Sequence, residues 1–122
     1  MTTELNWVYQ ELGIKRKNVR WSTGGRNEEG KIYLNFWHHL FQSYDEYAYK
    51  RRDQTESAGF KEMRELIKDA LANHNGIVGC IMVVAEDKDA SPRKVKKAYP
   101  SGECRITSFD EAADAFTAVR VR

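Results

Sequence analysis

The sequence predicts an α+β fold, in which a small mixed sheet has helices packed on it. Three segments support this prediction. Residues 3–12 place apolar side chains at helical spacing, residues 32–37 alternate as a half-buried strand does, and residues 77–85 are apolar without alternation. The last pattern is typical of a strand covered on both faces. With 122 residues the chain can build one modest core, so we expect a single domain over residues 1–122.

The N-terminal helix is predicted from a single apolar stripe. The stripe follows the spacing i, i+3, i+4 and i+7, and Gly13 is a suitable stop for the helix. Its members are Leu5, Val8, Tyr9 and Leu12. Trp7 lies off the stripe.

The segment 32–37 predicts a strand with two different faces. Ile32, Leu34 and Phe36 point to one side, toward the expected core. The opposite side carries two aromatic residues and an amide, Tyr33, Trp37 and Asn35. Residues 19–22 are expected to pair with this strand across a glycine-containing connection.

The middle of the chain predicts one more helix. Residues 38–57 predict a loop, or a short helix and then a loop. An amphipathic helix follows and ends near residues 73–76. Its apolar residues are Phe60, Met63, Ile67, Ala70 and Leu71.

Beyond the buried strand the sequence predicts two helices and a closing strand. Ser91 and Pro92 are typical of the N-cap and first residue of a short helix that would carry the cations of residues 93–97. The sequence Ser108–Glu111 matches a capping box and predicts a helix through residues 112–116. Residues 118–122 alternate again and predict a strand.

The composition restricts the class of protein but not its partner. Twenty Lys and Arg against 18 Asp and Glu leave a net charge of only +2, so only the placement of charge can indicate a partner. Two cysteines are too few for a disulfide scaffold or a four-cysteine zinc site, and Cys80 is expected to be a buried thiol. No apolar run approaches ~18 residues and no signal-peptide pattern opens the sequence, so we expect a cytoplasmic protein without a membrane partner.

Two patterns raise the question of metal chemistry. His38 and His39 are adjacent on the predicted strand, so their side chains point to opposite faces and cannot hold one ion together. Residues 86–88, Glu-Asp-Lys, close the buried strand like part of a metal-dependent nuclease site. Such a site also needs an acid on an upstream strand, whereas Asp69 lies on the predicted helix. We therefore expect no catalytic residues, no metal and no cofactor, with a small metal-dependent nuclease as an alternative.

Cations and aromatic residues gather in three segments. Cations neutralise phosphates, aromatic faces stack on exposed bases, and an asparagine can hydrogen-bond to a base edge. The candidate nucleic-acid-binding residues are Lys15, Arg16, Lys17, Arg20, Trp21, Ser22, Tyr33, Asn35, Trp37, Arg93, Lys94, Lys96 and Lys97. Residues 50–52, Lys-Arg-Arg, add a further basic cluster.

Parts of these segments resemble a known family. Residues 18–22 (Asn-Val-Arg-Trp-Ser), 30–37 (Gly-Lys-Ile-Tyr-Leu-Asn-Phe-Trp) and 90–95 (Ala-Ser-Pro-Arg-Lys-Val) are similar to the PUA/EVE type of small α+β base-reading module. Such modules occur in bacterial restriction-like proteins, often beside HNH nuclease domains. The resemblance covers residues 14–100 and implies that Trp21 and Trp37 clasp a flipped or modified base. The chain departs from the pattern after Ser22, where another bulky residue is expected, and it shows no HNH spacing.

The sequence thus predicts a non-enzymatic, stand-alone module that binds DNA or RNA in a restriction or phage–host conflict setting. The alternative is a protein-interaction module, an inhibitor or adaptor, because surfaces rich in Tyr and Trp are typical of interface anchors.

Overall fold

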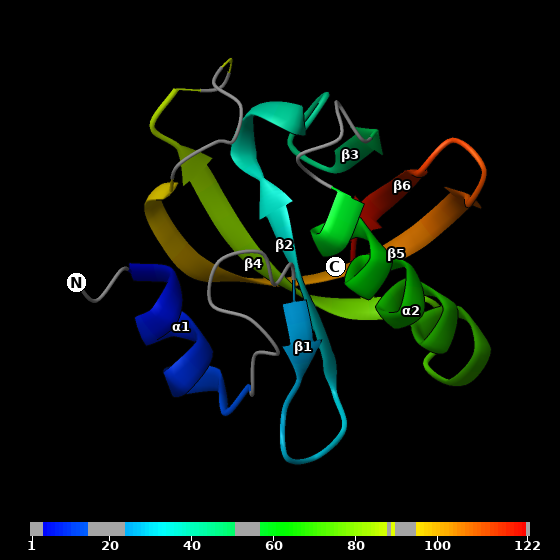
Figure 1. The fold of residues 1–122 in the computed structure, drawn as a ribbon, viewed down its shortest axis with the longest axis horizontal. Helices are drawn as coiled ribbons and strands as arrows, with labels where there is room; N and C mark the ends of the chain where they lie inside the picture. The colour runs from blue at the N-terminus through cyan, green and yellow to red at the C-terminus, as the bar shows by residue number, and fades with distance from the viewer. Residues whose placement is uncertain (1–3, 15–23, 51–56, 88, 90–94, 122) are drawn as a thin grey trace.

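The computed structural model describes residues 4–14, 24–50, 57–87, 89 and 95–121. These residues form a mixed sheet with helices packed on it, which confirms the predicted α+β class (Figure 1). In chain order the elements are α1 (Glu4–Leu12), β1 (Gly24–Arg26), β2 (Ile32–Trp37), the 3-10 turn η1 (His38–Leu40), β3 (Glu46–Lys50), α2 (Ser57–Asn73), β4 (Ile77–Ala85), β5 (Val95–Asp110) and β6 (Ala115–Arg120).

The sheet is curled, so that its last strand returns toward its second. The strand order is β1-β2-β4-β5-β6-β3, with β2 and β4 parallel and the other described pairs antiparallel. Although β3 lies at the far edge, Tyr47 forms an isolated bridge with Phe41 and its ring centroid is 4.7 Å from that of Phe36 on β2. The backbone N–H of Trp37 also donates to the Tyr47 hydroxyl, at 3.0 Å. The curl therefore gives the sheet an inner and an outer face.

The central strand β4 is covered on both faces, as its continuous apolar run predicts. Val78, Cys80 and Met82 point inward, into the core cluster that includes the apolar residues of α2. Ile81 and Val83 point outward, into a second cluster built by α1. Figure 1 shows the two helices on separate parts of the sheet.

The helices predicted over residues 3–12 and before residues 73–76 form, as α1 and α2, and end where the sequence indicates. Gly13, at a φ of 71°, follows α1, and the Ile14 N–H donates to the Tyr9 carbonyl at 2.9 Å. Beyond α2, Gly76 has a φ of 76° and its N–H reaches the Ala70 carbonyl at 2.8 Å. The inner core residues of α2 are Met63, Leu66, Ile67 and Ala70. The prediction that Leu71 belongs to the apolar stripe of this helix is wrong, because Leu71 is 45% exposed.

In the described residues, strands stand where the capping patterns predict two C-terminal helices. Val95 begins the long strand β5, so Lys96 and Lys97 are strand residues, while residues 91–94 lie outside the described part. Residues 108–110 end β5, and the segment 115–120 forms β6, paired Ser108 with Thr117 and Phe109 with Phe116.

The capping-box residues instead shape a hairpin turn. The Asp110 carboxylate accepts from the Ala113 N–H at 3.1 Å, which is a cap on a turn rather than on a helix. Asp114 then takes a left-handed φ of 52° and accepts from Arg64 of α2 at 3.1 Å. The buried Phe116 and the ladder with β5 outweigh the local helical pattern.

The segment that predicted only a loop or short helix also contains a strand. His38 and His39 belong to η1, not to the end of β2, and residues 46–50 form β3 against β6. Residues 24–26 form β1 and pair with β2 in antiparallel orientation, whereas residues 19–22, which the sequence predicts in that place, lie outside the described part. The closing strand is confirmed, although it begins earlier, at Ala115.

Candidate nucleic-acid interface

The outer face of β2 carries three of the predicted site residues together, and α1 partly covers it. The side chains of Tyr33, Asn35 and Trp37 are each half-buried, alternating with the buried Ile32, Leu34 and Phe36. The alternation is therefore as predicted. The hydroxyl of Tyr9 on α1 donates to Asn35 Oδ1 at 2.7 Å, so one acceptor of this amide is occupied within the fold.

Tyr33 lies across the neighbouring strand rather than out into solvent. Gly79 of β4 is its register partner, and a Cβ at position 79 would collide with the Tyr33 ring. Lys31 extends over the same ring, with Nζ 5.2 Å from its centroid, and pairs with Glu103 of β5 at 2.9 Å. The hydrogen bond to Glu103 is the main cause that raises the pKa of Lys31. This part of the face is held together by its own contacts.

Trp37 occupies the boundary between the two core clusters. It packs against both of them, and its ring centroid lies 6.0 Å from that of His39. The side chain therefore contributes to the packing of the fold, whatever it contacts from outside.

Lys96 and Lys97 are exposed at the start of β5. Lys97 Nζ lies over the ring of Tyr99, 5.5 Å from its centroid. The remaining predicted site residues lie outside the described part of the chain: Lys15, Arg16, Lys17, Arg20, Trp21, Ser22, Arg93 and Lys94.

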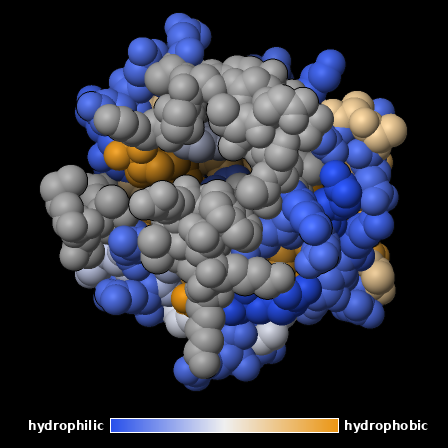
Figure 2. All heavy atoms as spheres, viewed as in Figure 1, coloured by the Kyte–Doolittle hydropathy of each residue, from blue (hydrophilic) through white to orange (hydrophobic). Residues whose placement is uncertain are grey.

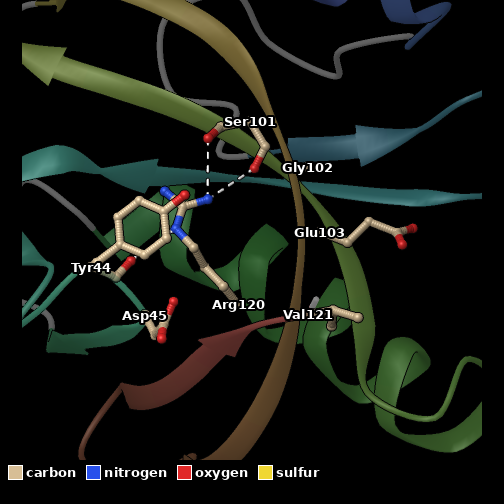
Figure 3. Close-up of a pocket in the computed structure, with 7 residues that line it drawn as sticks. All are labelled: Tyr44, Asp45, Ser101, Gly102, Glu103, Arg120 and Val121. Carbon is tan, nitrogen blue, oxygen red and sulfur yellow. Dashed lines mark hydrogen bonds between the residues drawn. The ribbon is translucent and has the colours of Figure 1, made fainter.

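The structure adds one cation and two aromatic residues that no sequence pattern indicated. The guanidinium of Arg120, at the end of β6, lies over two rings, with Cζ 4.9 Å from the centroid of Phe41 and 5.2 Å from that of Tyr44. Its Nε donates to the Tyr44 carbonyl at 2.9 Å, and Nη1 donates to the carbonyl and the hydroxyl of Ser101 at 3.1 and 3.2 Å (Figure 3). Among the described residues, Nη2 has no hydrogen-bond acceptor.

These residues share the inner side of the sheet with Tyr99. Tyr99 is the register partner of Met82, and Arg120 is that of Cys104, and side chains directly opposite on paired strands lie on one face. Met82 and Cys104 both belong to the inner core cluster. We call the following group the cation–aromatic surface: Phe41, Tyr44, Lys97, Tyr99 and Arg120.

A pocket of about 470 Å³ opens at this surface. Its lining residues are Tyr44, Asp45, Ser101, Gly102, Glu103, Arg120 and Val121. Figure 3 shows the Tyr44 ring against the Arg120 guanidinium, while the side chain of Glu103 points away from them. The volume falls within the range of roughly 300–1,000 Å³ that is usual for small-ligand sites.

The patterns that suggested metal chemistry are not assembled into a site within the described residues. No three His, Cys, Asp or Glu side chains gather there in an arrangement that could hold an ion. Asp69 lies on α2, as expected, and pairs with Arg26 of β1 at 2.9 Å. Glu86 and Asp87 are exposed beyond β4, and Lys88 is outside the described part.

The two cysteines are buried free thiols on neighbouring strands, as predicted for Cys80. A hydrogen bond to Cys104 and burial raise the pKa of Cys80. A buried thiol of raised pKa is a poor nucleophile.

The chain matches no protein-family model, and no curated protein or solved structure is significantly similar to it. In the part that the structure describes, no helix is both long and apolar enough to cross a bilayer. The function is therefore inferred from this chain's own residues.

Proposed function

We propose that this protein binds nucleic acid and that the cation–aromatic surface is part of its interface. One observation carries the proposal. Lys97 and Arg120 lie over aromatic rings and have no carboxylate partner among the described residues. Four described cations are instead neutralised within the fold by ion pairs, namely Arg26, Lys31, Arg64 and Lys68.

Two such cations beside one exposed ring, that of Tyr44, and two half-buried rings, those of Phe41 and Tyr99, suit a strand of nucleic acid. The cations attract phosphates, and the rings offer faces on which bases stack without requiring a particular sequence. On the face seen in Figure 2 the described surface is mostly hydrophilic, with hydrophobic residues visible only in small areas.

The residues predicted from sequence enter the same proposal with different roles. Trp37 and Tyr33 belong to the fold's packing, whereas Lys96 and Lys97 stand exposed at the start of β5. The basic run 15–20 and Trp21 stay predictions, as does the reading of a modified base in a restriction or phage-defence setting.

Fluorescence anisotropy titrations test the proposal. The titrations use four labelled probes at two salt concentrations: single-stranded DNA, single-stranded RNA, duplex DNA, and the same duplex with 5-methylcytosine. We expect the Lys96→Ala/Lys97→Ala double variant to weaken binding. The Lys61→Ala/Lys68→Ala variant removes the same charge from α2 and serves as the control, with little effect expected. Equal affinities of both double variants and the unmodified protein would remove the β5 lysines from the interface.

The same labelled nucleic acids also test the two alternative functions. Incubating them with the protein and Mg²⁺ or Mn²⁺ tests the nuclease alternative. Cleavage that Lys88→Ala abolishes would show that the protein is a nuclease and would contradict the binding proposal. The protein-interaction module is favoured by Trp7, which is 55% exposed on α1, since exposed tryptophans are typical interface anchors. Absence of binding to every nucleic acid at low salt would favour that module.

A further inference from the structure

We infer that Cys80 and Cys104 are a redox-active pair, which hydrogen peroxide oxidises to a disulfide between β4 and β5. The inference goes beyond the proposed function and does not rest on it, because neither thiol belongs to the cation–aromatic surface. It assigns a modification site to the two cysteines of the chain.

The sheet places the two thiols side by side on its inner face. Cys104 is the register partner of Val78, two residues before Cys80, so the two cysteines lie diagonally across the β4–β5 ladder. Both belong to the inner core cluster, and a hydrogen bond joins their side chains. A disulfide therefore requires two neighbouring sulfur atoms to approach each other and no exchange of strand partners.

A β-bulge in β5 gives this diagonal pair room to close. The register of the two strands shifts by one residue at Cys80, which stands opposite two residues of β5, Ser101 and Gly102. Gly102 has a φ of 69°, and a Cβ at this position would meet no other atom within 4 Å. Because the ladder is already interrupted here, a small shift of the backbone toward Cys80 meets less resistance than in a regular sheet.

The two thiols differ in reactivity, as the two steps of disulfide formation require. The hydrogen bond from Cys80, and then the charge of Arg120, lower the pKa of Cys104 in spite of its burial. Arg120 is the register partner of Cys104 on β6. A thiolate of lowered pKa beside a cation and a second thiol is the usual target of peroxide. Cys104 is therefore oxidised first, and Cys80 completes the disulfide.

Two displacements on sulfur and oxygen form the bond. The Cys104 thiolate attacks one oxygen of hydrogen peroxide and breaks the O–O bond. The sulfur becomes a sulfenic acid, and the other oxygen leaves as hydroxide and takes up the proton that the thiol has lost. The Cys80 sulfur then gives up its proton and attacks the sulfenic sulfur, and the S–OH group leaves with that proton as a second water. The two thiols lose two electrons in all, and the peroxide gains them.

Both thiols are buried, so the oxidant must be small. Cys80 is 1% exposed and Cys104 is 0% exposed. The pocket of about 470 Å³ adjoins Cys104, because Glu103, its neighbour in the chain, and Arg120, its partner on β6, both line the pocket (Figure 3). Hydrogen peroxide is hardly larger than water, so a local opening of the strand at the bulge is enough to admit it.

The central test uses the unmodified protein. The folded protein is incubated with hydrogen peroxide, the remaining thiols are alkylated with iodoacetamide in denaturant, and the intact mass is measured. We expect a product that has lost two hydrogens and carries no alkyl group. Peptide mapping should find Cys80 linked to Cys104, and dithiothreitol should make both thiols open to alkylation again.

Two matched variants test the order of the steps. Cys80→Ala removes the second thiol, so the reaction should stop at the Cys104 sulfenic acid, which dimedone traps once the protein is denatured. Cys104→Ala leaves only the other buried thiol, and its labelling by dimedone should be at least about tenfold slower, because less thiolate is present. Circular dichroism checks that both variants fold.

Three results would overturn the inference. They are alkylation of both thiols after exposure to peroxide, disulfides that link two copies of the chain, and oxidation of Cys104 to a sulfinic acid without a disulfide in the unmodified protein. None of these results bears on nucleic-acid binding, which is measured by titration in reducing buffer. The inference and the proposed function can therefore fail separately.

Discussion

At the scale of single residues, Gly79 is explained by the side chain that crosses it. The ring of Tyr33 occupies the space where any Cβ at position 79 would lie. Gly79→Ala should therefore lower the free energy of unfolding by about 1–3 kcal/mol, as overpacking does. In a Tyr33→Ala background the same change should cost little, because the obstructing ring is gone. Urea denaturation of the four proteins of this double-mutant cycle measures the coupling, and additive effects would contradict the explanation.

Phe36 and Trp37 differ in the degree to which the fold depends on them. Phe36 is 0% exposed and lies among the rings of Phe41, Tyr47 and Phe116, so Phe36→Ala should cost about 3–5 kcal/mol. Trp37 is half-buried against both core clusters, so Trp37→Ala should also destabilise, but less. Chemical denaturation monitored by far-UV circular dichroism ranks the two. A larger loss for Trp37→Ala would mean that the outer cluster, not the inner one, dominates stability.

At the scale of elements, α2 is tied to the hairpin strand β1 through one carboxylate. Asp69 accepts from Asn73 at 2.7 Å and from Arg26 at 3.0 Å. The hydrogen bond from Asn73, and then that from Arg26, lower the pKa of Asp69. A folded-state pKa below the unfolded value gives stability that is fully present above the unfolded pKa and is lost as pH falls through the folded one.

Asn73→Ala should therefore destabilise the protein near neutral pH and have a smaller effect in acid. The unfolded pKa of an aspartate is about 3.9, so the difference in melting temperature between the two proteins should shrink below about pH 4. Thermal unfolding from pH 3 to 7 measures it. Glu28→Gln, in the turn between β1 and β2, is the control for general charge effects. A difference that does not change with pH would assign the effect of Asn73 to helix packing alone.

The sequence predicts helices and strands correctly where the hydrophobic pattern is long. It fails where a short capping motif competes with strand pairing between residues far apart in the fold. The alternation of β2 and the uniform run of β4 specified both strands and their faces. Residues 108–116 match a helix start, yet Phe116 gains more by joining the inner core than by staying on a short helix. The carboxylate of Asp110 caps a hairpin turn, because the same side-chain oxygen can cap either a turn or a helix.

At the scale of the whole molecule, the candidate site depends on the curl of the sheet. Residues 41–44, 97–101 and 120 are far apart in the sequence, and none of them forms a local motif. They meet because β5 and β6 carry Ser101 and Arg120 to the segment that precedes β3. A basic run predicts Lys97 as a site residue, whereas no sequence pattern indicates Arg120, whose two aromatic partners come from a segment that predicts only a loop or short helix.

Because the net charge is only +2, attraction of a nucleic acid must come from local cations rather than from the field of the whole molecule. Each phosphate contact that is lost should lower the slope of log affinity against log salt by about 0.9 for duplex DNA or about 0.7 for a single strand. Lys96→Ala/Lys97→Ala should reduce the slope by up to two contacts, and the triple change of Lys15, Arg16 and Lys17 to Ala by up to three. Titrations across a series of salt concentrations measure both slopes.

The salt slope depends on the number of phosphate contacts and not on stacking of the bases. The Tyr44→Ala variant should therefore lose affinity with its slope unchanged. A slope that falls with Tyr44→Ala would mean that this ring orders a phosphate contact instead of stacking on a base.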